Sequence, residues 1–206
     1  MTRALGLLVG AYCLGSVSFS LVVVWVLRRV DVRTLGSGNP GATNVLRTAG
    51  RWPALLVLLL DVAKGIVPVQ AARRLGAPPE LVAGSALAAI LGHVFPLFFG
   101  FRGGKGVATG FGAFVALFPL AGGAALALWI VVVAATRYVS IASMVAAVAV
   151  PALAWGLGRF GVEPPPSPAV LAIAVAGAAT ILARHRSNLR RLAAGSERRL
   201  GRREAA

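Results

Sequence analysis

The stretch GSGNPGATNVLR, residues 36–47, gathers backbone and side-chain groups that are suited to binding phosphate. Gly36, Gly38 and Gly41 have no Cβ atom, so successive backbone N–H groups can converge on an oxyanion. Arg47 adds a planar fork of donors that matches phosphate geometry. The neutral donors of the same stretch are Ser37, Asn39, Thr43 and Asn44. We therefore predict an anion-binding loop; the alternative is a flexible linker in which Arg47 is only a topology charge.

A second glycine-rich stretch, FRGGKGVATG at residues 101–110, has Lys105 among its glycines, directly before a predicted helix. A lysine, glycines and a helix N-terminus together favour an anion site. The spacing is not that of a nucleotide-binding P-loop, because glycine follows the lysine where serine or threonine is required. The alternative is a glycine-rich helix entry whose lysine reaches the membrane interface. The residues that we predict to bind substrate here are Gly103, Gly104, Gly106 and Thr109.

A third polar stretch, HRSNLRRLAAGSE at residues 185–197, follows the last apolar run. His185 and Asn188 are three residues apart, so on a helix they share a face and could point toward the other polar stretches. His185 is a candidate base, although a lone histidine at such a position is more often an interfacial residue. We predict that Glu197 is structural and pairs with an arginine.

Two further pairs of polar residues lie in apolar surroundings. Ser140 and Ser143, in RYVSIAS, share one face at the start of a predicted helix. They are candidates for the substrate site, and the alternative for Ser140 is a helix cap. Asp61 and Lys64 lie mid-span and three residues apart, which favours a structural ion pair that faces the bundle interior.

The composition indicates an integral membrane protein of the all-α class. The 206 residues are 58% hydrophobic, with a mean hydropathy of +0.82 and a net charge of +15, a combination atypical of soluble domains. The basic residues flank apolar runs without aromatic interleaving, so we assign them to anionic lipids and topology signals rather than to nucleic acid. Two histidines, one cysteine and six carboxylates supply too few ligands for a metal cluster, and we predict neither metal nor cofactor.

The lengths of the apolar runs predict how many helices position these residues. A spanning helix needs about 20 apolar residues for a hydrocarbon core roughly 30 Å thick. The run 107–135 is too long for one helix and contains Pro119, so we predict two short helices that pair there. Together with the other runs this gives seven transmembrane helices in a single domain, residues 1–206. The other predicted spans are 4–27, 53–71, 81–99, 140–158 and 167–184.

The arginines predict the orientation of this bundle. With the N-terminus outside and the C-terminus cytoplasmic, the arginine-rich tail lies inside, as the positive-inside rule requires. All three polar stretches then face the cytoplasm.

Five motifs in a fixed order make the chain similar to the acyl-phosphate:glycerol-3-phosphate acyltransferases, the PlsY family of the bacterial inner membrane. The motifs are GSGNPGATNVLR, LDVAKG, GHVFPLFFGFRGGKGVATG, RYVSIAS and HRSNLRRLAAGSE. The resemblance implies transfer of a fatty acyl group from acyl phosphate to the 1-hydroxyl of glycerol 3-phosphate, which gives lysophosphatidic acid and phosphate, the first step of phospholipid synthesis. It also implies a seven-helix bundle with a cytoplasmic active site.

The resemblance also implies roles for individual residues. Ser37 and Arg47 are then essential, the second loop's glycines around Lys105 bind acyl phosphate, and His185 and Asn188 are important for activity. The implied partners are glycerol 3-phosphate, long-chain acyl phosphate, membrane lipids and the soluble enzyme that makes acyl phosphate. Two questions stay open: the base is His185 or a substrate phosphate, and the alternative function is a transporter of an anionic metabolite.

Overall fold

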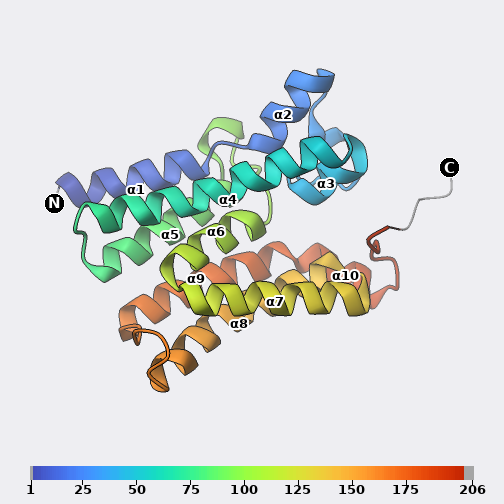
Figure 1. The fold of residues 1–206 in the computed structure, drawn as a ribbon. Helices are drawn as coiled ribbons and strands as arrows, with labels where there is room; N and C mark the ends of the chain where they lie inside the picture. The colour runs from blue at the N-terminus through green and yellow to red at the C-terminus, as the bar shows by residue number, and fades with distance from the viewer. Residues whose placement is uncertain (1, 202–206) are drawn as a thin grey trace.

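The structure, a computed structural model, describes residues 2–201 and contains only helices in that part of the chain (Figure 1). The predicted all-α class is therefore confirmed. The helices are α1 (Thr2–Gly15), α2 (Phe19–Arg28), η1 (Val32–Thr34), α3 (Ala42–Thr48), α4 (Arg51–Arg74), α5 (Pro79–Val94), η2 (Leu97–Phe99), α6 (Val107–Leu117), α7 (Pro119–Thr136), α8 (Val139–Arg159), α9 (Pro168–Arg184) and α10 (Arg186–Ala193).

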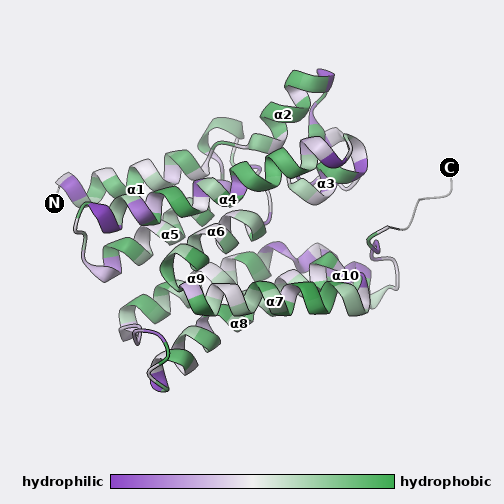
Figure 2. Cartoon of the chain, in the orientation of Figure 1, coloured by the Kyte–Doolittle hydropathy of each residue, from purple (hydrophilic) through white to green (hydrophobic). Residues whose placement is uncertain are grey.

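The predicted pair of short helices is present, since α6 ends at Leu117 and α7 begins at Pro119. The predicted first span lies within one candidate span, Thr2–Arg28, whose helix is interrupted between α1 and α2. Among residues 2–201, five helical stretches are long and apolar enough to cross a membrane, or six if α9 and α10, bent by 49°, are one span. At 1.5 Å per residue α6 is only about 16 Å long, so seven crossings remain a prediction. Figure 2 shows hydrophilic residues at helix ends and around α3 and α10.

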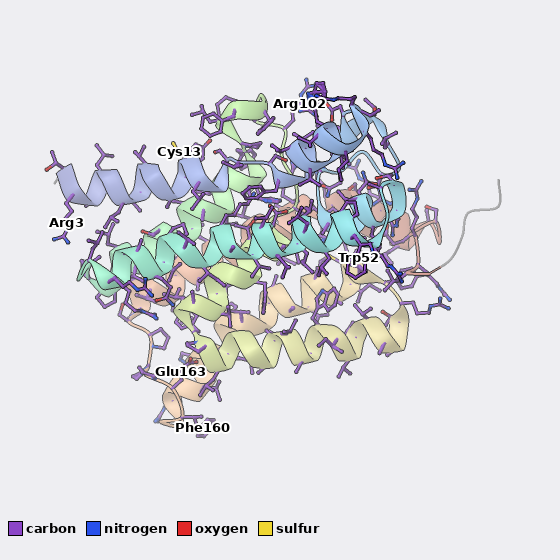
Figure 3. All side chains as sticks on the ribbon, turned by 45° about the horizontal axis from the view of Figure 1, so that its top comes forward. Arg3, Cys13, Trp52, Arg102, Phe160 and Glu163 are labelled. Atoms are coloured by element: carbon purple, nitrogen blue, oxygen red, sulfur yellow. The ribbon has the colours of Figure 1, made fainter. Side chains whose placement is uncertain are left out.

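The turn at Pro119 is capped by a carboxylate from another part of the chain. Glu163, in the connection between α8 and α9, accepts the backbone N–H groups of Leu120 at 3.0 Å and of Ala121 at 3.4 Å. These are orphan donors of the first turn of α7, and an anion there is also favoured by the helix dipole. Figure 3 shows Glu163 at the end of the bundle opposite to Trp52. The cap therefore fixes the start of α7.

Glycines let α4 and α6 pack closely against each other. A Cβ atom at Gly65 would overlap the carbonyl oxygen of Thr109, and one at Gly112 would overlap that of Val62. Small residues at such crossings allow membrane helices to approach each other. Because the second glycine loop leads directly into α6, this crossing also positions the loop.

We expect Gly112→Ala to destabilise the fold. The new methyl group would push α4 and α6 apart, and overpacking of this kind costs roughly 1–3 kcal/mol. Thermal unfolding in detergent measures the effect. Gly123→Ala, at a position in α7 with open space around it, serves as the control and should keep the wild-type melting temperature. Equal stability of the two variants would contradict a close crossing.

The predicted ion pair lies inside the bundle. Lys64 Nζ is 2.8 Å from Asp61 Oδ1, and both side chains are buried. Lys64 Nζ also donates to the carbonyl oxygen of Val17 at 2.6 Å. Val17 lies in the break between α1 and α2, where carbonyl groups lose their helical partners. The pair therefore stabilises the break as well as its own helix.

Candidate active site

The three polar stretches meet at one end of the bundle, near α3 and α10 in Figure 1. Gly104 of the second loop lies against the carbonyl oxygen of Pro40 in the first loop. Arg184, at the end of α9, donates to the carbonyl oxygens of Gly103 at 3.1 Å and Gly104 at 3.3 Å. The second loop is therefore held between the first loop and the junction of α9 with α10.

The first loop is organised by Asn44, which is almost fully buried. Its Oδ1 accepts the Ser37 N–H at 2.9 Å, and its Nδ2 donates to the carbonyl oxygens of Val32 at 3.2 Å and Leu35 at 3.0 Å. Gly36, between these partners, has a φ of +57°, which favours glycine. These bonds give Asn44 a structural task in the loop, and its contact with substrate stays a prediction.

Other polar groups of the first loop remain available to a ligand. Within residues 2–201, the hydroxyls of Ser37 and Thr43 and the amide of Asn39 have no hydrogen-bond partner. Ser37 and Arg47 are exposed. Thr43 and Arg47 are four residues apart on α3, so they share a helix face. The loop thus presents hydroxyls, an amide and a guanidinium together.

Two glycines of the second loop have a structural task, and the predicted binding of substrate by this loop stays a prediction. The N–H groups of Gly103 and Gly104 donate to the carbonyl oxygens of Val94 and His93, both at 3.2 Å, and so complete the C-terminal end of α5. These two N–H groups are therefore hydrogen-bonded within the protein. Glycine is required here because a Cβ at either position would overlap atoms of His93. The Lys105 side chain is a group of this loop that suits an anion.

Lys105 lies in a cluster of charges contributed by all three stretches. Burial lowers its pKa to about 8. Glu197 favours the charged form, whereas the arginines Arg191, Arg47 and Arg184 oppose it. Four cations against one carboxylate make this end of the bundle a strong attractor of anions.

His185 is held as a neutral ring with a defined tautomer. Its Nδ1 is 2.8 Å from the carbonyl oxygen of Ile181. A carbonyl can only accept, so Nδ1 carries the proton and Nε2 is free to accept. Burial lowers the pKa of His185 to about 4, with a smaller opposing contribution from the Ile181 hydrogen bond. His185 is therefore a hydrogen-bond acceptor and a weak base at neutral pH.

Glu197 connects the tail to α8 and α10, and the predicted pairing with an arginine is present. Its Oε1 accepts from Asn188 Nδ2 at 2.6 Å and from Ser140 Oγ at 2.7 Å, and its Oε2 accepts from Arg191 Nε at 2.8 Å. Burial opposes the charge, but these hydrogen bonds outweigh it and lower the pKa of Glu197. Asn188 Oδ1 is buried and lacks a partner among residues 2–201. That atom is a second free acceptor beside His185.

Three hydroxyls that we predicted to bind substrate are used inside the protein. Ser140 donates to Glu197. Ser143 donates to the carbonyl oxygen of Val139 at 2.7 Å and accepts from Trp129 at 3.2 Å. Thr109 Oγ1 is 3.1 Å from Nδ1 of His93. These hydrogen bonds indicate supporting tasks, and contact of the three hydroxyls with substrate stays a prediction.

Two residues of the site were missed by the sequence analysis. Arg184 was included there only among the basic residues assigned to lipids and topology, yet it donates two hydrogen bonds to the second loop. His93 was not assigned a role, yet it contacts that loop with its ring and its backbone. The available signals were local: Arg184 directly precedes His185, and His93 is the other of the two histidines.

The family model described as glycerol-3-phosphate acyltransferase matches residues 5–195. The chain belongs to this acyltransferase family. It is 48% identical to the glycerol-3-phosphate acyltransferase of Rubrobacter xylanophilus over 98% of this chain and 96% of the relative. It is 45% identical to that of Thioalkalivibrio sulfidiphilus, with the same two coverages. The family resemblance seen in the sequence is thereby confirmed.

The acyltransferase fold is also shared with solved structures. The chain resembles the crystal structure of PlsY, an integral membrane glycerol 3-phosphate acyltransferase, in its glycerol 3-phosphate form, with a TM-score of 0.88 and 40% identity over 97% of this chain and 96% of that one. For the lysophosphatidic acid form the TM-score is 0.85 and the identity 38%, with the same coverages. The protein is therefore a multi-pass membrane enzyme, and a transporter is not favoured.

Proposed function

We propose that the protein transfers a fatty acyl group from acyl phosphate to the 1-hydroxyl of glycerol 3-phosphate. The observation that carries this proposal is the position of Lys105 among arginines, beside the two free acceptors of His185 and Asn188. Two phosphate-bearing substrates need several cations at one place, and a glycerol carries two hydroxyl donors for two acceptors. Relatives named glycerol-3-phosphate acyltransferase, and PlsY structures in substrate and product forms, support the same reaction.

In the proposed reaction, Arg47 and Ser37 bind the phosphate of glycerol 3-phosphate, and Lys105 binds the acyl phosphate. The cations neutralise the repulsion between the two phosphates, so proximity supplies much of the rate. The 1-hydroxyl oxygen forms a bond to the acyl carbon, the bond from that carbon to the phosphate oxygen breaks, and its electron pair leaves with phosphate. Lys105 stabilises the charge that develops on this leaving group.

The hydroxyl proton passes to a substrate phosphate oxygen in this proposal. A phosphate monoester has a second pKa of about 6, whereas that of His185 is lowered to about 4. The phosphate is the stronger base of the two. His185 and Asn188 then orient the glycerol hydroxyls as hydrogen-bond acceptors.

We further infer that the active site faces the cytoplasm of a bacterial inner membrane, with the N-terminus outside and the C-terminus inside. The loops and tail that carry most arginines lie at the same end as the site, which agrees with the positive-inside rule. A soluble enzyme that makes acyl phosphate could then deliver the donor from this side.

A single assay tests the proposed function. Purified protein is incubated with glycerol 3-phosphate and either acyl phosphate or acyl-CoA, and lysophosphatidic acid is measured. We expect product with acyl phosphate alone. Product from acyl-CoA would overturn the donor assignment. Absence of product with both, together with uptake of glycerol 3-phosphate into proteoliposomes, would instead favour a transporter.

The charge of Lys105 predicts an alkaline limit to activity. Its pKa of about 8 means that the ammonium form dominates below this pH and is lost above it. We therefore expect kcat/KM to fall about tenfold per pH unit above pH 8. This fall is the alkaline limb of the pH profile. Lys105→Arg should move the limb to higher pH, since arginine stays protonated. A limb that stays at pH 8 in this variant would assign the titration to another group.

A further inference from the structure

His93 is buried at the end of α5, directly behind the second loop. Its backbone carbonyl oxygen accepts the N–H of Gly104 at 3.2 Å. Its ring packs against the same glycine, because a Cβ at Gly104 would overlap Nε2. The second loop therefore rests on both the backbone and the ring of His93.

The opposite edge of the His93 ring faces two other helices. Nδ1 is 3.1 Å from Thr109 Oγ1 in the first turn of α6 and 3.8 Å from Asp61 Oδ1 in α4. Gly104 directly precedes Lys105, and Thr109 follows it by four residues. One imidazole thus contacts the chain on both sides of Lys105, so a shift of the ring shifts Lys105.

The buried ion pair lies beside the ring, and the 3.8 Å between Nδ1 and Asp61 Oδ1 is too long for a hydrogen bond. Asp61 is fixed by Lys64 at 2.8 Å, and Lys64 is fixed by the carbonyl oxygen of Val17. Buried charges in a membrane protein are costly unless they are paired. The surrounding side chains must therefore keep Asp61 and Lys64 together. The pair therefore joins α4 to the break between α1 and α2, directly beside the ring that contacts the second loop.

We propose that His93 is a positioning residue for acyl transfer, which sets the location of Lys105 by holding the second loop and the first turn of α6 against the end of α5. The inference rests on the proposed function, in which Lys105 binds the acyl phosphate. His93 acts through the loop backbone and through Thr109, not through contact with the substrate.

Three variants separate the contacts of the ring. His93→Phe keeps an aromatic ring without its nitrogen atoms. Thr109→Val removes the hydroxyl partner with little change of shape. His93→Asn keeps a polar atom near the position of Nδ1. Because a small displacement of a catalytic group is costly, we expect kcat/KM to fall about tenfold or more in His93→Phe, about threefold in Thr109→Val, and less in His93→Asn than in His93→Phe.

The pH profile separates positioning from a loss of folded enzyme. Lys105 faces Arg47 of α3, Arg184 of α9, Arg191 of α10 and Glu197 of the tail, and burial holds its pKa at about 8. A displaced loop lets water reach the lysine, so its pKa rises. We expect the alkaline limb of kcat/KM to move up by about one pH unit in His93→Phe and Thr109→Val. Partial unfolding lowers the rate without moving the limb.

Val82→Ala is the matched control, because Val82 is buried in the same helix, eleven residues before His93. It should lower thermal stability and keep the limb near pH 8. The inference is overturned if His93→Phe and Thr109→Val keep this limb and lose no more activity than Val82→Ala. If His93→Phe does not fold, a wild-type rate and limb in Thr109→Val and His93→Asn overturn it. Failure of the proposed function is distinct, since the wild-type protein would then make no lysophosphatidic acid.

Discussion

Arg47→Ala is expected to reduce acyl transfer by roughly 10³-fold or more, the range found when a cationic clamp or an oxyanion donor is removed from a transition state. Arg47 is exposed at the end of α3, shares a face with Thr43, and contributes to the charge around Lys105. Its loss removes the fork that binds phosphate in the proposed site. The measurement is lysophosphatidic acid formation by purified enzyme in detergent at saturating substrate.

Two further variants test the specificity of this effect. Arg47→Lys keeps the charge without the planar fork, so we expect intermediate activity. Ser37→Ala, which removes a hydroxyl that has no partner within residues 2–201, should lower the rate by roughly 10²-fold or more. Both proteins should insert into the membrane and melt as the wild type does. Full activity in Arg47→Ala or Ser37→Ala would remove that residue from the site.

Gly104→Ala is expected to lower kcat/KM by roughly 10²-fold, mainly through a higher KM for acyl phosphate. The added methyl group would meet Nε2 of His93 on one side and the carbonyl oxygen of Pro40 on the other. Neither neighbour can yield easily, because one belongs to a buried ring and the other to the backbone. The second loop must therefore shift, and Lys105 shifts with it.

The control for Gly104→Ala is Gly156→Ala, at a position in α8 with open space around it. This variant should keep wild-type kinetics for both substrates. Steady-state kinetics with acyl phosphate and glycerol 3-phosphate varied separately make the comparison. A defect of Gly104→Ala that is confined to kcat would argue against a role of the loop in binding acyl phosphate.

Much of the fold was predictable because its signals are local. Long apolar runs predict membrane helices whatever lies beside them, and Pro119 predicts a break because it cannot continue a helix. The pair of Asp61 and Lys64 was predictable from a spacing of three residues on one helix. The break between α1 and α2 was not predicted, because the run 4–27 is long enough for one span; at this break Lys64 of α4 donates to the carbonyl oxygen of Val17.

The sequence by itself determined the class of the protein and the polar stretches that meet at its candidate site, because residue type and spacing are properties of the chain. Only the tertiary structure decided which polar groups of these stretches remain available to a ligand. Asn44, Thr109, Ser140 and Ser143 use theirs on partners within the protein, and the proton on Nδ1 of His185 is fixed by a backbone carbonyl. The contacts of His93 and Arg184 with the second loop were likewise found only in the tertiary structure. The physical reason is that a buried polar group must find a partner, and packing brings most of these partners from distant parts of the chain.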